Sequence, residues 1–264
     1  MTRMPTYFIS HGGGPWPWMA DWRAMFRNLE ASFVQMVKDL PERPKAILMI
    51  SGHWEDSSFA VMSSANPPMV YDYSGFPPET FKIQYKVPGA PDLAQKGADL
   101  IKAAGLPVRL DEKQGFDHGC FVPAYVMYPD ASVPVFQVSL RKGYNPADHF
   151  ALGRALAPLR DEGVLIVGSG LSYHNLRFFG PAAKEPSEAF DAWLAETMGK
   201  PAAERARIMR RLGDLITQHV PEIADIETRD TGQVIGQTGK QLVPRAADNF
   251  HYFAEMCTRV DGHT

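Results

Sequence analysis

Short apolar runs alternate with amphipathic segments along most of the chain, the pattern of an α/β protein. The apolar runs predict strands at 7–10, 46–51, 59–63, 81–85, 108–110, 133–139 and 164–168. Apolar residues at helical spacing predict helices at 17–40, 92–104, 122–127, 146–159, 187–198 and 202–219, and a last helix that begins near Asp248. We therefore expect one three-layer α/β domain over residues 1–264, with a central mostly parallel or mixed sheet flanked by helices.

Composition narrows the class of protein. The 264 residues are 45% hydrophobic and 22% charged, with a formal net charge of −3, which is typical of a globular domain and not of a disordered chain. No basic block predicts a nucleic-acid partner, and no apolar run is long enough to predict a membrane span. The N-terminus lacks the apolar stretch of a secretory signal, and Cys120 and Cys257 do not form a disulfide framework. These features favour a cytoplasmic protein.

Three histidines follow predicted strands. His11 and His53 each come directly after an apolar run, and His174 lies just beyond the strand predicted at 164–168. In open α/β sheets, ligands bind at the carboxyl ends of the strands. We therefore expect these side chains to converge in one cleft.

Two further histidines lie in unusual local sequence. His118 follows Asp117, a candidate to orient its imidazole, and His251 lies in the last predicted helix. The remaining three of the eight histidines, His149, His219 and His263, have no such context. Imidazole is a common ligand of zinc, iron and copper, and histidines with few cysteines favour a catalytic metal with open coordination positions.

Several motifs in order along the chain carry a family resemblance. They are Ser10-His11-Gly12, Ser51-Gly52-His53-Trp54, the stretches 71–77 and 85–91, Phe116-Asp117-His118-Gly119, and the stretch 168–176. Together they resemble the class III extradiol ring-cleaving dioxygenases, in the 4,5-DOPA dioxygenase-like (DODA-type) branch of the LigB superfamily. Two places depart from the pattern of that branch: the sequence on either side of His251, and Cys120-Phe121 after Gly119.

The resemblance implies a role for each of the five histidines. By position, His11, His53 and His251 are similar to the three metal ligands of the family. His174 is similar to its acid/base histidine outside the metal shell, and His118 to a pocket histidine that contacts substrate or oxygen. The same motifs contain four aromatic residues, Trp54, Tyr71, Tyr73 and Phe76. The sequence leaves open whether they line the pocket or pack in the core.

The activity that the resemblance implies is opening of a catecholic ring with O2 to a muconic semialdehyde-type product. The implied cofactor is Fe(II), with Zn(II) as the metal of a purified form because imidazole sites bind zinc more tightly. The implied partners are a small catecholic substrate and O2, and a homo-oligomer is compatible with this interpretation. The substrate, the cleavage position and the native metal stay open.

Two other functions fit the same histidines. A zinc hydrolase would use them to hold Zn²⁺ and activate water, and it would need no oxygen. A non-catalytic binding protein would keep the fold without the metal chemistry. The presence of His11, His53, His174 and His251 together counts against the second alternative.

Overall fold

The computed structural model describes residues 2–171, 180–231 and 234–257. The chain forms two compact units, Met1–Ser172 and Tyr173–Thr264. The first contains the strands and the second consists of helices over its described residues. The expectation of a single catalytic domain over residues 1–264 stays a prediction.

The centre of the first unit is a parallel sheet with the strand order β1-β8-β2-β6. Every neighbouring pair in it runs parallel, so all four strands end at the same edge. The strands are β1 (Thr6–Ser10), β8 (Val164–Gly170), β2 (Ala46–Ser51) and β6 (Val135–Gln137). This confirms the expected α/β architecture, and the sheet is parallel throughout.

Residue type explains the place of each strand in the sheet. Strand β2 reads Ala-Ile-Leu-Met-Ile-Ser and is buried along nearly its whole length, as expected of a parallel strand covered on both faces. Strand β8 begins with four buried aliphatic residues. Strand β1 pairs only with β8 among the described strands, and its Phe8 side chain is exposed, which fits an edge position.

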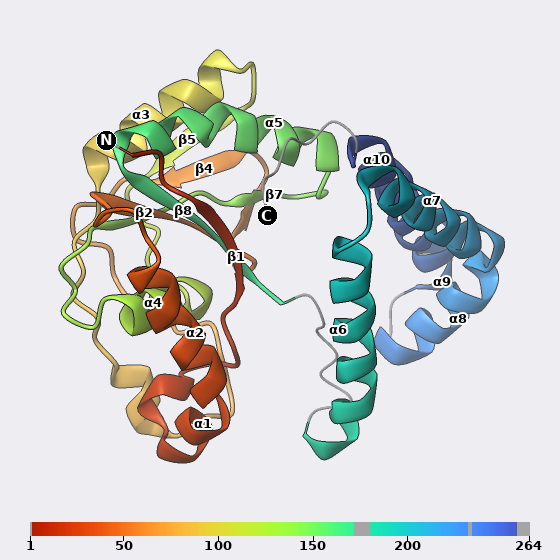
Figure 1. The fold of residues 1–264 in the computed structure, drawn as a ribbon, viewed down its shortest axis with the longest axis horizontal. Coiled ribbons are helices and arrows are strands. Elements are labelled where there is room, and N and C mark those ends of the chain that lie inside the picture. The colour runs from red at the N-terminus through yellow and green to blue at the C-terminus, as the bar shows by residue number, and fades with distance from the viewer. Residues whose placement is uncertain (1, 172–179, 232–233, 258–264) are drawn as a thin grey trace. The chain divides into compact units, whose positions relative to one another are not determined.

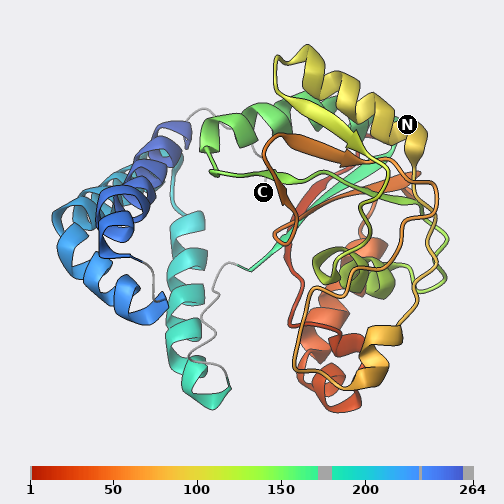
Figure 2. The same cartoon turned by 180° about the vertical axis from the view of Figure 1, so that it is seen from behind.

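Helices cover both faces of this sheet. In Figures 1 and 2, α3 (Pro91–Ala103) and α5 (Pro146–Leu156) lie on one face. Helix α4 (His118–Met127) lies on the other face, and α2 (Arg27–Lys38) packs against α4. The short α1 (Ala20–Met25) precedes α2. The helix expected over residues 17–40 is therefore two α-helices, preceded by a 3-10 turn at Trp16–Trp18.

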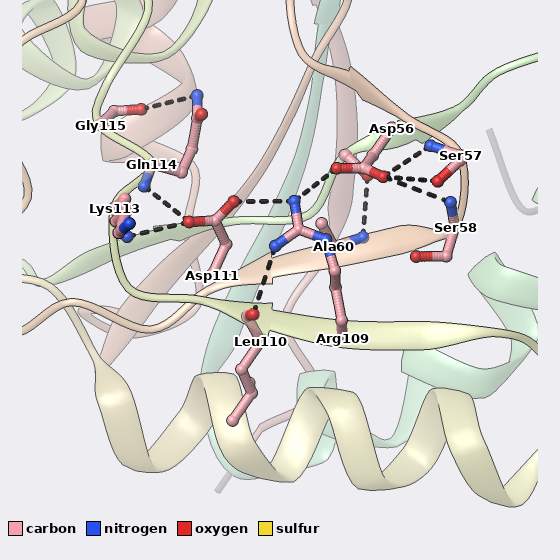
Figure 3. Close-up of polar contacts among 11 residues, drawn as sticks. Asp56, Ser57, Ser58, Ala60, Arg109, Leu110, Asp111, Lys113, Gln114 and Gly115 are labelled. Carbon is pink, nitrogen blue, oxygen red and sulfur yellow. Dashed lines mark hydrogen bonds and ion pairs between the residues drawn. The ribbon is translucent and has the colours of Figure 1, made fainter.

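Two short strand pairs extend the first unit. Strands β4 (Phe59–Met62) and β5 (Val108–Asp111) pair in parallel and are connected through α3, and β3 (Glu55–Asp56) pairs with β7 (Leu140–Arg141). Figure 3 shows Arg109 of β5 between the carboxylates of Asp56 and Asp111, so that one guanidinium ties the two pairs together. The strand expected at 81–85 is absent, and a 3-10 turn occupies Pro78–Lys82.

The second unit is helical over its described residues. It comprises α6 (Lys184–Met198), α7 (Ala202–Gln218), α8 (Val220–Thr231), the short α9 (Ile235–Gln237), a π-helical turn at Thr238–Leu242 and α10 (Val243–Met256). Helices α7 and α10 pack along each other. Helix α10 begins five residues before Asp248, the expected start, and Pro244 occupies its first turn.

Across the described ranges, no helix combines the length and the apolar character that a membrane crossing requires.

Candidate metal centre

The sheet topology brings His11 and His53 to one edge. His11 directly follows β1, and His53 follows β2 after Gly52. Strand β8 runs between β1 and β2, and its Ser169 is in register with Ile9 on one side and Ser51 on the other. The two histidines therefore flank the end of β8, as the sequence predicts.

His118 joins them from the start of a helix. It is the first residue of α4, which Asp117 caps by accepting a hydrogen bond from the Cys120 N–H. Each of His11, His53 and His118 offers one nitrogen, and these atoms all lie within 4.8 Å of one another. His11 and His118 are buried, whereas the His53 side chain is 30% exposed, so the group is reachable from solvent. The three histidines form a group that can hold a metal ion.

Ser169 fixes the orientation of His11. The His11 Nδ1 lies 2.9 Å from the Ser169 Oγ, and the Ser169 hydroxyl donates a hydrogen bond to the carbonyl of Gly119. The serine oxygen therefore accepts a hydrogen bond from His11 Nδ1–H. This assigns the His11 proton to Nδ1 and leaves a lone pair on Nε2.

Asp72 fixes both of the other histidines. Its carboxylate lies 2.9 Å from the Nδ1 of His118 and 3.2 Å from the Nδ1 of His53. Burial opposes ionisation of Asp72, but hydrogen bonding to His118 and the charges of His118 and His53 outweigh it, so the pKa of this carboxyl is lowered. An ionised carboxylate only accepts, so both imidazoles carry a proton on Nδ1.

The donor set fits a metal ion. The Nε2 atoms of His11 and His53 lie 3.1 Å apart, within hydrogen-bond distance, so one of them donates to the other when it carries a proton. Two nitrogens bound to one ion at the 2.0–2.1 Å of zinc–imidazole bonds lie about 2.9 Å apart at a right angle and about 3.3 Å apart at the tetrahedral angle. The spacing is therefore also that of two neighbouring ligands of one metal ion.

Asp117 has a different role from the one expected for it. Its Oδ1 accepts hydrogen bonds from the Ser51 hydroxyl at 2.6 Å and from the Cys120 N–H at 3.1 Å, which ties α4 to the end of β2. Burial is the main reason that the pKa of Asp117 rises to about 6. Among the described residues, the hydrogen-bonded carboxylate partner of the His118 ring is Asp72 and not Asp117.

Gly119 allows this close packing. A Cβ atom on Gly119 would lie 2.4 Å from the Ser51 Oγ and 3.0 Å from the Cδ2 of His53. Any larger residue would therefore displace the Ser51 side chain and the His53 ring. The second residue of α4 is therefore constrained by the histidine group itself.

The aromatic residues near the site divide into two groups. The Tyr73 ring packs edge-on against His118 at 5.9 Å between centroids, and its hydroxyl donates to the carbonyl of Thr80. Burial is the main reason that the pKa of Tyr73 rises to about 12. Tyr71 donates to the carbonyl of Ile83, and Trp54 is buried in the core. Tyr73 thus borders the histidines, while Tyr71 holds its loop and Trp54 packs internally.

The remaining predicted site residues lie in the second unit. His251 is on α10, where its ring packs against Gly213 of α7 and its Nε2 lies 3.1 Å from Asp214 Oδ1. Glu255, one turn later, pairs with Arg210. His174 lies outside the described residues. The role of His174 and that of His251 as a metal ligand stay predictions.

Two residues of this site were not predicted from the sequence. Ser169 lies at the end of β8, where the parallel pairing with β1 places it beside His11. Asp72 lies in an irregular loop 46 residues before His118. The stretch 71–77 supports the family resemblance, but its spacing does not indicate which imidazole the carboxylate contacts.

A comparison with protein families identifies the chain. Residues 6–226 match the model described as the catalytic LigB subunit of aromatic ring-opening dioxygenase. The chain belongs to the LigB family. The LigB match starts at β1 and includes all three clustered histidines.

Curated relatives of two kinds are similar to this LigB family member. Dioxygenase tasH of Hapsidospora irregularis is 40% identical over 67% of this chain and 57% of its own length. The 4,5-DOPA dioxygenase extradiol of Beta vulgaris is 40% identical over 72% of this chain and 70% of its own length. The 5-carboxymethyl-2-hydroxymuconate semialdehyde dehydrogenase of Escherichia coli is 53% identical over 83 residues, 31% of this chain and 17% of its own length.

Proposed function

We propose that this protein is an Fe(II)-dependent extradiol dioxygenase that opens a catecholic ring with O2 to a muconic semialdehyde-type product. The observation that carries the proposal is the group of His11, His53 and His118 at the carboxyl edge of a parallel sheet in a LigB family member. The similarity to 4,5-DOPA dioxygenase extradiol supports a small aromatic substrate. A bound Fe(II) would supply open positions for a catechol and for oxygen.

The chain's own residues prepare this site for such a substrate. Ser169 and Asp72 hold the Nδ1 atoms of the three histidines, so that the rings keep one orientation. Tyr73 borders the His118 ring on one side and offers an aromatic edge beside the site. The partly exposed His53 marks the side from which a substrate enters. His174 is proposed to accept and return the catechol proton, a role that suits a pKa near neutrality.

The third metal ligand has two candidates. We propose His118, because it lies with His11 and His53 in one group and its ring is oriented by the same carboxylate as that of His53. His251, the position that the resemblance selects, is the alternative. The two proposals predict opposite results when each histidine is removed.

Oxygen dependence separates the dioxygenase from the zinc hydrolase. We expect anaerobic loading with Fe(II), followed by air and a panel of catechols, to give oxygen uptake and a yellow product with at least one of them. The same assay on His11→Ala is the control and should give neither. Metal binding without oxygen uptake, together with hydrolysis by the zinc-loaded protein, would support the hydrolase. Failure to retain a metal would support the binding protein.

A separate proposal concerns the second unit. We infer that the 83 residues similar to the semialdehyde dehydrogenase fall within Tyr173–Thr264, which is long enough to hold them and departs from the LigB-branch pattern around His251. The named substrate of that relative is a muconate semialdehyde, the class of product that extradiol opening gives. The match spans 17% of the dehydrogenase, so we propose a helical segment and not a second catalytic domain. NADH formation from a semialdehyde by the full chain would contradict this.

A further inference from the structure

Asp72 contacts two of the three clustered histidines. Its Oδ1 accepts from the backbone N–H of His118 at 2.9 Å and lies 2.9 Å from the Nδ1 of the same residue, and its Oδ2 lies 3.2 Å from the Nδ1 of His53. The Asp72 side chain is 19% exposed and the His118 side chain 8%. One carboxylate in a largely buried place thus serves two rings from different elements.

The chemistry of a carboxylate explains why this matters. Neutral histidine carries its proton on either nitrogen, and the group that the other atom contacts decides which. A carboxylate has no proton to donate, so each ring that contacts it through Nδ1 must place its proton there. In the neutral ring the lone pair then lies on Nε2, the atom of His53 that lies 3.1 Å from Nε2 of His11.

We propose that Asp72 is a positioning residue that fixes His53 and His118 as Nδ1–H tautomers, with their Nε2 atoms ready to bind the metal. The inference rests on the metal centre of the proposed function. It does not depend on which reaction the metal supports. Partners of this kind orient metal-bound imidazoles in many proteins, and their loss typically weakens metal binding by about 10- to 100-fold.

Asp72 also has a structural contact, which the experiment must separate from positioning. Its bond to the His118 N–H anchors the loop to the first turn of α4, where a carboxylate is favoured by the helix dipole. Asp72→Asn keeps an oxygen in the Oδ1 position and so retains this bond and one of the two contacts that Asp72 makes with His118 Nδ1. The new amide replaces Oδ2 and donates toward His53 Nδ1. His53 must then accept at Nδ1 and carry its proton on Nε2.

The test combines two measurements on the full chain. Competition with a chromophoric chelator should show Zn(II) binding about 10- to 100-fold weaker in Asp72→Asn than in the wild type. Nitrogen-15 NMR of the metal-free proteins should show His53 and His118 as Nδ1–H tautomers in the wild type. In the variant, His53 should change to Nε2–H.

Asp148→Asn is the matched control. Asp148 is also a partly buried carboxylate of the first unit, but its partner is Arg141 at 2.6 Å. This variant should bind Zn(II) as the wild type does and keep both histidine tautomers. If it lost affinity as much as Asp72→Asn, a general loss of stability would explain both.

Two results would overturn the proposal. One is a wild-type His53 that carries its proton on Nε2, a measurement that needs no variant to fold. The other is unchanged Zn(II) affinity in a folded Asp72→Asn variant. Neither measurement uses ring opening, so a wild type without dioxygenase activity would contradict the proposed reaction and leave the role of Asp72 intact.

Discussion

His118 in the first unit and His251 in the second both face an aspartate, at 2.9 Å from Asp72 and 3.1 Å from Asp214. The pairs differ in exposure: the His118 side chain is 8% exposed and that of His251 is 40% exposed. They also differ in the nitrogen used, since His118 contacts its aspartate through Nδ1 and His251 through Nε2. The same two residue types thus make a shared, buried network in one place and a surface pair in the other.

The difference follows from the elements that carry each pair. His118 begins a buried helix packed on the parallel sheet, and its carboxylate also holds His53. His251 and Asp214 lie on the paired helices α10 and α7, and each has considerable exposure. An exposed pair is screened by water and typically contributes about 0–1 kcal/mol to stability. Burial and convergence on further histidines therefore distinguish the His118 pair from the His251 pair.

Removing His118 and His251 in turn tests this comparison, and it should give the largest effect on Zn(II) affinity. We expect His118→Ala to weaken Zn(II) binding by more than the roughly 100-fold that loss of an outer partner costs, because it would remove the proposed third ligand. His251→Ala should leave the affinity unchanged, because its described contacts lie within the second unit. Equilibrium dialysis against a zinc buffer measures both.

The reverse result would favour the other assignment. If His251→Ala abolished binding and His118→Ala retained it, His251 would be the third ligand and His118 a pocket residue. His149→Ala is a suitable control for histidine removal in general. His149 contacts the carbonyl of Asn145 and the N–H of Arg141, so its loss should not affect the metal.

Gly119→Ala should have a smaller effect than His118→Ala at the same histidine group. The added methyl would lie 2.4 Å from the Ser51 Oγ and 3.0 Å from the His53 ring, so these side chains must shift. Overpacking of this kind typically costs about 1–3 kcal/mol. Chemical denaturation should show that loss, and Zn(II) affinity should fall with it because His53 moves.

Gly153→Ala provides the matched control. Gly153 lies inside α5, and a Cβ there meets no described atom within 4 Å. Alanine in an open helical position is expected to stabilise the protein by about 0.5–1 kcal/mol. A Gly119→Ala variant as stable as Gly153→Ala would show that the first unit is not tightly packed at the site.

The sequence predicted the parts of the site that depend on strand ends. Strands β1, β2 and β8 lie within one or two residues of their predicted positions because each contains a short apolar run, which is buried in β2 and β8. Their parallel pairing brings His11 and His53 to one edge as expected. This success rests on local periodicity together with a general rule for α/β sheets.

The same reasoning did not find Asp72, and it selected Asp117 as the orienting residue. Asp117 is adjacent to His118 in sequence, but as the cap of α4 its carboxylate turns toward the Cys120 N–H and Ser51. Asp72 reaches the ring from an irregular loop, and neither hydrophobic periodicity nor spacing encodes that contact. The residues of helix α8 were assigned to no element, although Pro221 lies in its first turn and only His219 separates it from α7.

Arg109 lies in the first unit, as His118 does, but its ion pairs are exposed. It therefore tests whether exposure decides how much a charged pair contributes to stability. Its guanidinium contacts Asp56 and Asp111 (Figure 3) and its side chain is 45% exposed. The hydrogen bond from Arg109 is the largest cause of the lowered pKa of Asp56. The pKa of Asp111 is lowered as well: burial opposes this, but the N–H groups of Lys113 and Gln114 and then Arg109 outweigh it.

Both aspartates ionise more readily in the folded protein, so their contribution to stability is present above the ordinary pKa of 3.8 and is lost as the pH falls through their lowered values. We expect Arg109→Met to lower the free energy of unfolding by about 1 kcal/mol or less at pH 7, because the group is exposed. The deficit should begin to shrink below about pH 4, where the aspartates of the unfolded chain become protonated, and should vanish below the lowered pKa values of the folded protein. Urea denaturation of both proteins from pH 3 to 8 measures this difference. A deficit that stayed constant over that range would mean that Arg109 acts through packing of its aliphatic stem and not through its charge.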